Sequence, residues 1–270
     1  MKIKLLNYLV FASFLFAGVV WAGDVEDADA ALAKKDYATA LKKYKNAALK
    51  NNAYAQVMIG SFYSNDGYGV EKNDAEAVRW YKLAAAQGNA SSQTNIGAMY
   101  YTGRGVIQDY VEATRWFKLA AAQEFAAAQL TLATMYDEGK GVAQDYAEAA
   151  RWLKRAAAQG NVNAQLNLSI MYLEGQGVAQ DYAEAVRWLK LAAAQGNTGA
   201  QFNLSSMYAL GNGVVQDYVL AHMWSNLASV SNEENNKRRD LIATKMTPQQ
   251  IAEAQKLARE CQARNFKNCD

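Results

Sequence analysis

The sequence predicts an all-α protein, a right-handed α-solenoid of antiparallel helix pairs. Two observations predict it. Tryptophans recur at a constant spacing of 36 residues, at Trp80, Trp116, Trp152, Trp188 and Trp224. Apolar residues within a repeat follow helical spacing, as at Ala164, Leu168, Met171 and Tyr172. Two short helices cannot bury their apolar faces alone, so neighbouring repeats must stack and share a core.

Residues 1–22 are predicted to be a secretory signal. Lys2 and Lys4 precede an apolar run that ends at Val20, and Val-Trp-Ala stands before Gly23. The run is shorter than the roughly 20 residues that a membrane-spanning helix needs. We therefore expect cleavage after Ala22, a periplasmic or secreted location, and no stable membrane insertion of the mature chain.

The charge composition argues against two classes of partner. The chain has 28 basic and 26 acidic residues, and loss of Lys2 and Lys4 leaves 26 basic residues against 26 acidic ones. A neutral chain without a basic run lacks the charge that drives binding to nucleic acid or to anionic lipid. Nucleic acid and anionic lipid are therefore unexpected as partners, and the partner predicted below is a protein.

The repeats are expected to be closed by caps at both ends. Residues 23–52 keep a diluted repeat pattern, with Lys43 at the tryptophan position, and are predicted to form an N-terminal capping helix pair. Five repeats occupy residues 53–230. Residues 231–270 are predicted to hold two capping helices, at about 232–246 and 248–264, because Thr247, Pro248 and Gln250 form a typical helix start.

Helix ends are marked within each repeat. Second helices are predicted to begin at the N-cap residues Asp109, Asp145, Asp181 and Asp217. They are followed by a glycine suited to a left-handed conformation, at Gly88, Gly160 and Gly196. The third repeat carries Glu124-Phe125 instead, so we expect its turn to be reshaped.

A small residue follows the central apolar residue of every first helix. These residues are Gly60, Gly97, Ala133, Ser169 and Ser205. The requirement for small size suggests that the backbone of another helix approaches closely there.

The recurring phrase Gly-x-Gly-Val-x-Gln-Asp-Tyr-Ala-Glu-Ala-x-Arg-Trp, with Ala-Ala-Ala-Gln-Gly-Asn after it, resembles the Sel-one-like repeat family, which is related to the tetratricopeptide repeats. The resemblance covers about residues 36 to 230. It implies a right-handed superhelix of antiparallel helix pairs. It also implies adaptor and scaffold roles, often in the bacterial envelope or at a host interface, without naming a partner.

The sequence predicts no catalytic, cofactor-binding or metal site. His222 is the only histidine and occupies a packing position, so no metal-binding cluster can be assembled. Gly103-Arg104-Gly105 and its equivalents recur in the repeats, which indicates a turn requirement rather than a phosphate-binding loop. Glutamates three residues before Arg115, Arg151 and Arg187 suit exposed ion pairs, although a ligand-facing row of arginines is an alternative.

Cys261 and Cys269 are the only cysteines, and a disulfide between them is expected in an oxidising compartment. The bond would tie the C-terminus to the last helix. A redox-active pair is the alternative, but no Cys-x-x-Cys motif supports it.

The first helices of stacked pairs usually line the concave side of a solenoid, where a partner segment can contact several repeats. Short polar residues recur on these helices, and we predict that they bind the partner: Asn95, Thr131, Asn167 and Asn203. The alternative is that they satisfy carbonyl groups of neighbouring helices.

The leading hypothesis is a non-enzymatic scaffold or adaptor in the bacterial envelope that binds a partner segment in its concave groove. One alternative is a cell-wall-associated hydrolase or penicillin-binding accessory, since some cysteine-rich relatives of the family bind penicillin. The chain, however, contains no Ser-x-x-Lys and no Gly-x-Ser-x-Gly motif. Further alternatives are a secreted host-interaction factor and a self-associating envelope component.

Overall fold

Helices follow one another along the chain in the computed structural model, which describes residues 23–228 and 233–269. The predicted signal at residues 1–22 lies outside the described residues. All regular structure in the described ranges is helical, which confirms the predicted all-α solenoid of helix pairs. The chain divides into two compact units, Met1–Gln123 and Glu124–Asp270, which we call the N-terminal and C-terminal units.

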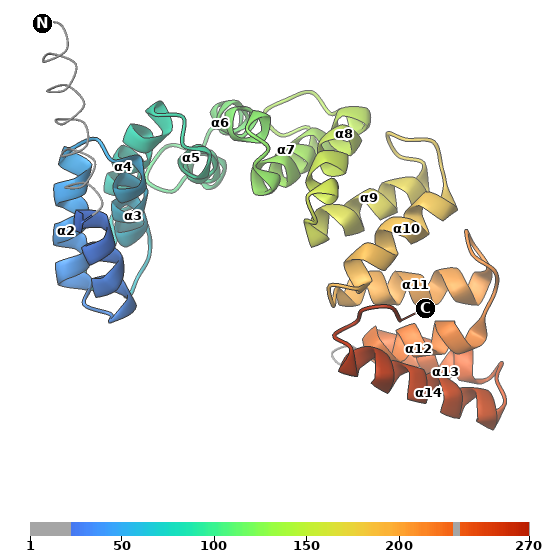
Figure 1. Cartoon of the computed structure of the whole chain (residues 1–270). Coiled ribbons are helices and arrows are strands. Elements are labelled where there is room, and N and C mark those ends of the chain that lie inside the picture. The colour runs from blue at the N-terminus through green and yellow to red at the C-terminus, as the bar shows by residue number, and fades with distance from the viewer. Residues whose placement is uncertain (1–22, 229–232, 270) are drawn as a thin grey trace, which may run out of the picture. The chain divides into compact units, whose positions relative to one another are not determined.

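The N-terminal unit begins with a helix over residues 23–33, where the first capping helix was predicted. The helices that follow are α2 (Tyr37–Leu49), α3 (Ala53–Ser64), α4 (Asp74–Ala86), α5 (Ala90–Thr102) and α6 (Tyr110–Ala122) (Figure 1). The α3 helix pairs with α4, and α5 pairs with α6. Lys43, which stands at the tryptophan position of α2, forms an ion pair with Asp27 at 2.7 Å.

The C-terminal unit contains three further helix pairs and two closing helices. In chain order they are α7 (Ala126–Glu138), α8 (Tyr146–Ala158), α9 (Val162–Glu174), α10 (Tyr182–Ala193), α11 (Thr198–Leu210), α12 (Tyr218–Ala228), α13 (Glu233–Ala243) and α14 (Pro248–Ala263) (Figure 1). Both α13 and α14 pack against α12. Thr247 and Gln250 form the predicted capping box at the start of α14, with Pro248 at the first helical position.

Helix ends lie where local chemistry favours them. The predicted aspartates at the starts of second helices accept hydrogen bonds from backbone N–H groups, as at Asp109, Asp145, Asp181 and Asp217. Asparagines do the same for most first helices, as at Asn52, Asn89, Asn161 and Asn197. The predicted left-handed glycines Gly88, Gly160 and Gly196 have φ values of 85°, 87° and 80°.

The turn before α7 keeps this geometry, so the prediction that it would be reshaped is wrong. Glu124 takes the left-handed conformation itself, with φ at 61°. Its carboxylate pairs with Arg155 and accepts a hydrogen bond from Gln129 at 2.8 Å. These contacts help to offset the strain of a left-handed non-glycine residue. Phe125 stands at the N-cap of α7 without a side-chain hydrogen bond to the helix.

At Gly60 and Gly97 the small residue makes room for an aromatic ring, which corrects the expectation that the backbone of another helix approaches there. A Cβ atom on Gly60 would lie 2.6 Å from the ring of Tyr81 on α4. A Cβ on Gly97 would lie 3.1 Å from the ring of Phe117 on α6. The third and fourth repeats have leucine at the aromatic position, and there the small residues are Ala133 and Ser169.

A recurring pocket on the first-helix face

The residues predicted to bind a partner are half-buried on first helices: Asn95 on α5, Thr131 on α7, Asn167 on α9 and Asn203 on α11. The Thr131 hydroxyl donates to the Ala127 carbonyl of its own helix, at 3.0 Å. The three asparagine amides have no hydrogen-bond partner among the described residues. None of the four side chains therefore bonds to a carbonyl of a neighbouring helix. Binding through them stays a prediction.

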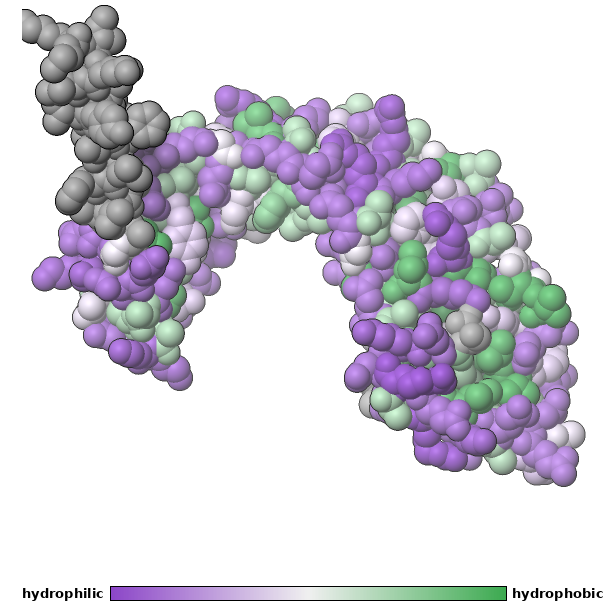
Figure 2. Space-filling model, viewed as in Figure 1, coloured by the Kyte–Doolittle hydropathy of each residue, from purple (hydrophilic) through white to green (hydrophobic). Residues whose placement is uncertain are grey.

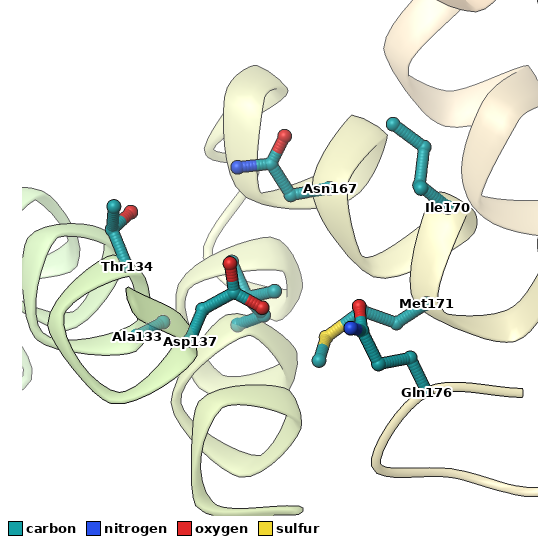
Figure 3. Close-up of a pocket in the computed structure, with 8 residues that line it drawn as sticks. Ala133, Thr134, Asp137, Asn167, Ile170, Met171 and Gln176 are labelled. Carbon is teal, nitrogen blue, oxygen red and sulfur yellow. The ribbon is translucent and has the colours of Figure 1, made fainter. Parts of the chain in front are cut away.

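Asn167 lines a pocket of about 220 Å³ in the C-terminal unit. The walls come from α7, α8 and α9 and from the turn after α9, through Ala133, Thr134, Asp137, Leu153, Asn167, Ile170, Met171 and Gln176. Figure 3 shows the Asp137 carboxylate and the Asn167 amide at the same hollow, from two successive first helices. No ion pair to Asp137 occurs among the described residues, so this pocket presents a free carboxylate beside a free amide.

Asn95 lines an equivalent pocket of about 140 Å³ in the N-terminal unit. Asn95 and Met99 correspond to Asn167 and Met171 in the repeat, and Tyr81 stands where Leu153 does. The remaining lining residues are Ser64, Ala98, Thr102 and Arg104. The same kind of pocket therefore occurs at equivalent positions in the two units.

The two pockets differ in charge. Arg104 lies 2.7 Å from Asp74 and donates to the Ser64 carbonyl at 2.8 Å. The hydrogen bond that Arg104 donates to the Asp74 carboxylate raises the pKa of the Arg104 guanidinium above its ordinary value. The equivalent position in the other pocket is the neutral Gln176, with Asp137 where Ser64 stands. The two pockets therefore share the asparagine amide and differ in the charge around it.

Both volumes lie below the about 300 to 1,000 Å³ that small-molecule and cofactor sites occupy. A hollow of this size fits one side chain of a bound segment.

A third hollow of about 390 Å³ lies between α11 and the closing helix α13. Leu210 and Leu241 line it and are each 66% exposed. Figure 2 shows apolar surface near α11 and α12 on the visible face of the C-terminal unit. Arg238 stacks on the ring of Phe202, 3.9 Å from its centre, beside the hollow. Leu210 therefore offers exposed apolar surface at this hollow.

A row of buried glutamines was not singled out in the sequence, although it repeats on the same lattice. Four of the five first-helix glutamines accept a hydrogen bond from the glutamine at the end of the next second helix: Gln87 donates to Gln56, Gln123 to Gln93, Gln159 to Gln129 and Gln195 to Gln165, at 2.8 to 2.9 Å. These bonds satisfy buried amides and join helices about 30 residues apart. Their role is structural.

The arginines of the second helices form the expected ion pairs with glutamates three residues earlier. Arg115, Arg151 and Arg187 lie 3.0 to 3.2 Å from their partners and are 57 to 80% exposed. Arg115 and Arg187 also stack over Trp116 and Trp188. This arrangement favours exposed ion pairs over a row of ligand-facing arginines.

His222 is 3% exposed and packed within α12, as its sequence neighbourhood predicted. Burial lowers the pKa of its imidazole, and the nearby Arg239 lowers it further. The part of the chain that the structure describes contains no cluster of histidine, cysteine or acidic residues fit to hold a metal ion. Cys261 and Cys269 are joined by a disulfide, as expected.

None of the described helices is both long and apolar enough to cross a membrane. This finding concerns residues 23–228 and 233–269 only.

The Sel1 repeat model matches the chain five times, at residues 53–89, 90–125, 126–161, 162–197 and 198–229. A Sel1 repeat protein from Oxalobacter formigenes is 30% identical, with a TM-score of 0.76 over 87% of this chain and 99% of that protein. A protective antigen of uropathogenic Escherichia coli that displays an SLR fold is 27% identical, with a TM-score of 0.45 over 92% of this chain and 70% of the antigen.

An immunity protein from Pseudomonas aeruginosa is 21% identical, with a TM-score of 0.47 over 82% of this chain and 81% of that protein. Among curated proteins, no sequence matches the chain. Sel1 repeat proteins generally mediate protein–protein interaction and are typically non-enzymatic scaffolds. The repeat matches cover more than half of the sequence, and the chain belongs to the Sel1 repeat family.

Proposed function

We propose that this protein is a non-enzymatic scaffold of the bacterial envelope that binds an extended segment of a protein partner along its first helices. The observation that carries the proposal is the recurrence of one pocket, with a free asparagine amide, at equivalent positions of the repeat. A catalytic site normally occurs once in a chain, whereas a surface that binds an extended segment needs similar binding features in several repeats.

The asparagine amides suit a peptide backbone because each offers both donors and an acceptor. Asn95 and Asn167 stand at the mouths of pockets, so a backbone bonded to them would place a side chain inside. The differing charge at Asp137 and Arg104 would then select different side chains at the two positions. We expect the pocket beside Asp137 to favour a basic or amide side chain.

The proposed periplasmic or secreted location rests on the sequence of residues 1–22 alone. Fractionation of cells that express the full chain tests it directly. A mature protein that begins at Gly23 in the periplasm or medium would support the proposal. Retention of the uncleaved chain in the cytoplasm would exclude it.

The binding surface is tested by capture from an envelope extract with the immobilised mature chain. The test variant is the double substitution Asn167→Arg and Asn203→Arg, which places two large cations on the first-helix face. The matched control is Gln255→Arg, because Gln255 is an exposed amide on α14 away from the pockets. Circular dichroism shows whether all three chains keep their helical content.

We expect one partner, identified by mass spectrometry, to bind wild type and the control and to be lost from the double variant. Equal capture by all three chains would place binding elsewhere and reject the proposed surface. Labelling with fluorescent penicillin addresses the enzymatic alternative, and a covalent adduct on the mature chain would overturn the non-enzymatic assignment.

A further inference from the structure

A second hollow, of about 800 Å³, lies in the C-terminal unit between the second helices α8 and α10. It is distinct from the first-helix pockets, and the proposed partner segment does not use it. Trp188, Leu191 and Ala158 form much of its apolar floor, and Leu191 is 44% exposed. Lys267, far along the chain beyond α14, forms part of its rim.

The disulfide explains how Lys267 reaches this rim. Cys261 lies in the last turn of α14 and Cys269 follows eight residues later, so the bond closes a short loop. Phe266 within this loop packs against the turn between α10 and α11, where a Cβ on Gly196 would lie 3.3 Å from its ring. The loop is therefore fixed at one end by the disulfide and at its tip by Phe266.

The hollow is basic. Lys154, Arg187 and Lys267 line it, and its lining contains no acidic side chain. Arg187 is already paired with Glu184 at 3.2 Å and stacks over Trp188. The side chains of Lys154 and Lys267 have no ion pair or hydrogen bond to any described residue, so their charges are uncompensated.

Lys154 departs from its repeat equivalents in this respect. Lys82 donates to the hydroxyl of Tyr100 at 3.2 Å, and Lys190 lies 5.7 Å from the ring centre of Tyr208. Those two ammonium groups are engaged within the repeat, whereas the one on Lys154 lines the hollow together with Lys267. Two cations without an ion-pair partner lie beside apolar side chains here. The complementary ligand carries negative charge next to an apolar group.

We propose that this hollow is a second docking site, which binds an acidic segment of a protein partner with an apolar side chain next to its carboxylates. The carboxylates pair with Lys154 and Lys267, and the apolar side chain covers Leu191 and Trp188. Because Lys267 stands in the loop that the disulfide closes, the site is complete only when Cys261 and Cys269 are bonded.

The probe is a short fluorescent peptide of alternating Asp and Leu, measured by anisotropy with the disulfide-bonded mature chain. A peptide with Asn at every Asp position is the control for charge. We expect the acidic peptide to bind more tightly, with an affinity that falls between about 50 and about 300 mM salt. Binding of both peptides with equal affinity would overturn the proposal.

Lys154→Glu and Lys267→Glu should each weaken binding of the acidic peptide about tenfold, since each replaces an attraction by a repulsion. Lys245→Glu is the matched control, because Lys245 is exposed beyond the opposite end of α14. Opening the disulfide with a reductant or by Cys269→Ser should weaken binding to the level of Lys267→Glu. Full affinity after reduction would remove the loop from the site.

Two further outcomes separate this site from other surfaces. The double substitution Asn167→Arg and Asn203→Arg should leave binding of the acidic peptide unchanged, so the two docking proposals fail independently. Binding of the chain to vesicles of phosphatidylglycerol and phosphatidylcholine without binding of the peptide would assign the cations to lipid and reject a peptide site.

Discussion

Substitution Gly60→Ala tests whether first and second helices pack by matching a small residue to a large ring. The added Cβ would lie 2.6, 2.7 and 3.0 Å from three carbon atoms of the Tyr81 ring, where favourable carbon contacts need about 3.5 to 4.0 Å. The ring is 4% exposed, and its hydroxyl lies 3.2 Å from both Ser61 Oγ and Ser64 Oγ. It therefore has little freedom to retreat.

The expected effect is a difference between two opposing terms. Overpacking of a well-packed core costs about 1 to 3 kcal/mol. Alanine favours the helix over glycine by about 1 kcal/mol. We expect Gly60→Ala to lower the free energy of unfolding by about 1 kcal/mol, measured by urea titration followed by circular dichroism.

A double-mutant cycle combines Gly60→Ala with Tyr81→Leu. The double variant has the alanine–leucine combination found at Ala133 and Leu153. We expect the double variant to be more stable than the sum of the single effects predicts, by about 1 kcal/mol. Ala98→Gly on the exposed side of α5 measures the helix-propensity term alone. A Gly60→Ala protein that is more stable than wild type, or single effects that simply add, would refute the packing argument.

Four further predictions are tested in the same unfolding assay. Phe125→Asn should stabilise the chain by about 1 kcal/mol, because α7 lacks the side-chain cap that Asn161 gives α9. An unchanged midpoint of the urea unfolding curve would contradict this. Thr247→Ala should cost about 1 kcal/mol by removing the capping box of α14, and an equal loss in Thr247→Ser would show that the hydroxyl is not its source.

Gln201→Leu should lower the free energy of unfolding by about 1 kcal/mol less than Gln165→Leu does. The reason is that the Gln201 oxygen has no hydrogen-bond partner, whereas the Gln165 oxygen accepts from Gln195 at 2.9 Å. Equal losses of stability in the two variants would contradict this. Burial lowers the pKa of His222 below its ordinary 6.5, so the unfolded chain binds more protons below about pH 6.5 and stability falls as the pH falls through that range. The free energy of unfolding of His222→Gln should fall less steeply over this pH range. Identical pH profiles for wild type and variant would exclude His222 as the source of the pH dependence.

Local structure could be predicted from the sequence because its causes are local. An N-cap such as Asp145 accepts from an N–H three residues later, and the glycine of a turn such as Gly160 needs only its own backbone freedom. The 36-residue repeat then implies stacking, since isolated helix pairs cannot bury their apolar faces. Fold class, helix limits and the asparagine row follow from these signals.

The tertiary structure decided everything that joins distant residues. Gly60 packs against the ring of Tyr81. Glu124 takes a left-handed conformation in its turn and pairs with Arg155, a contact that the local sequence of the turn does not predict. Gln159 bonds to Gln129 across 30 residues. Lys267 lies at the hollow between α8 and α10, in a loop that is closed by the disulfide and packed through Phe266 against the turn before α11. Repeat periodicity determines which helices are neighbours. The shape and charge of their side chains determine which contacts and pockets form between them.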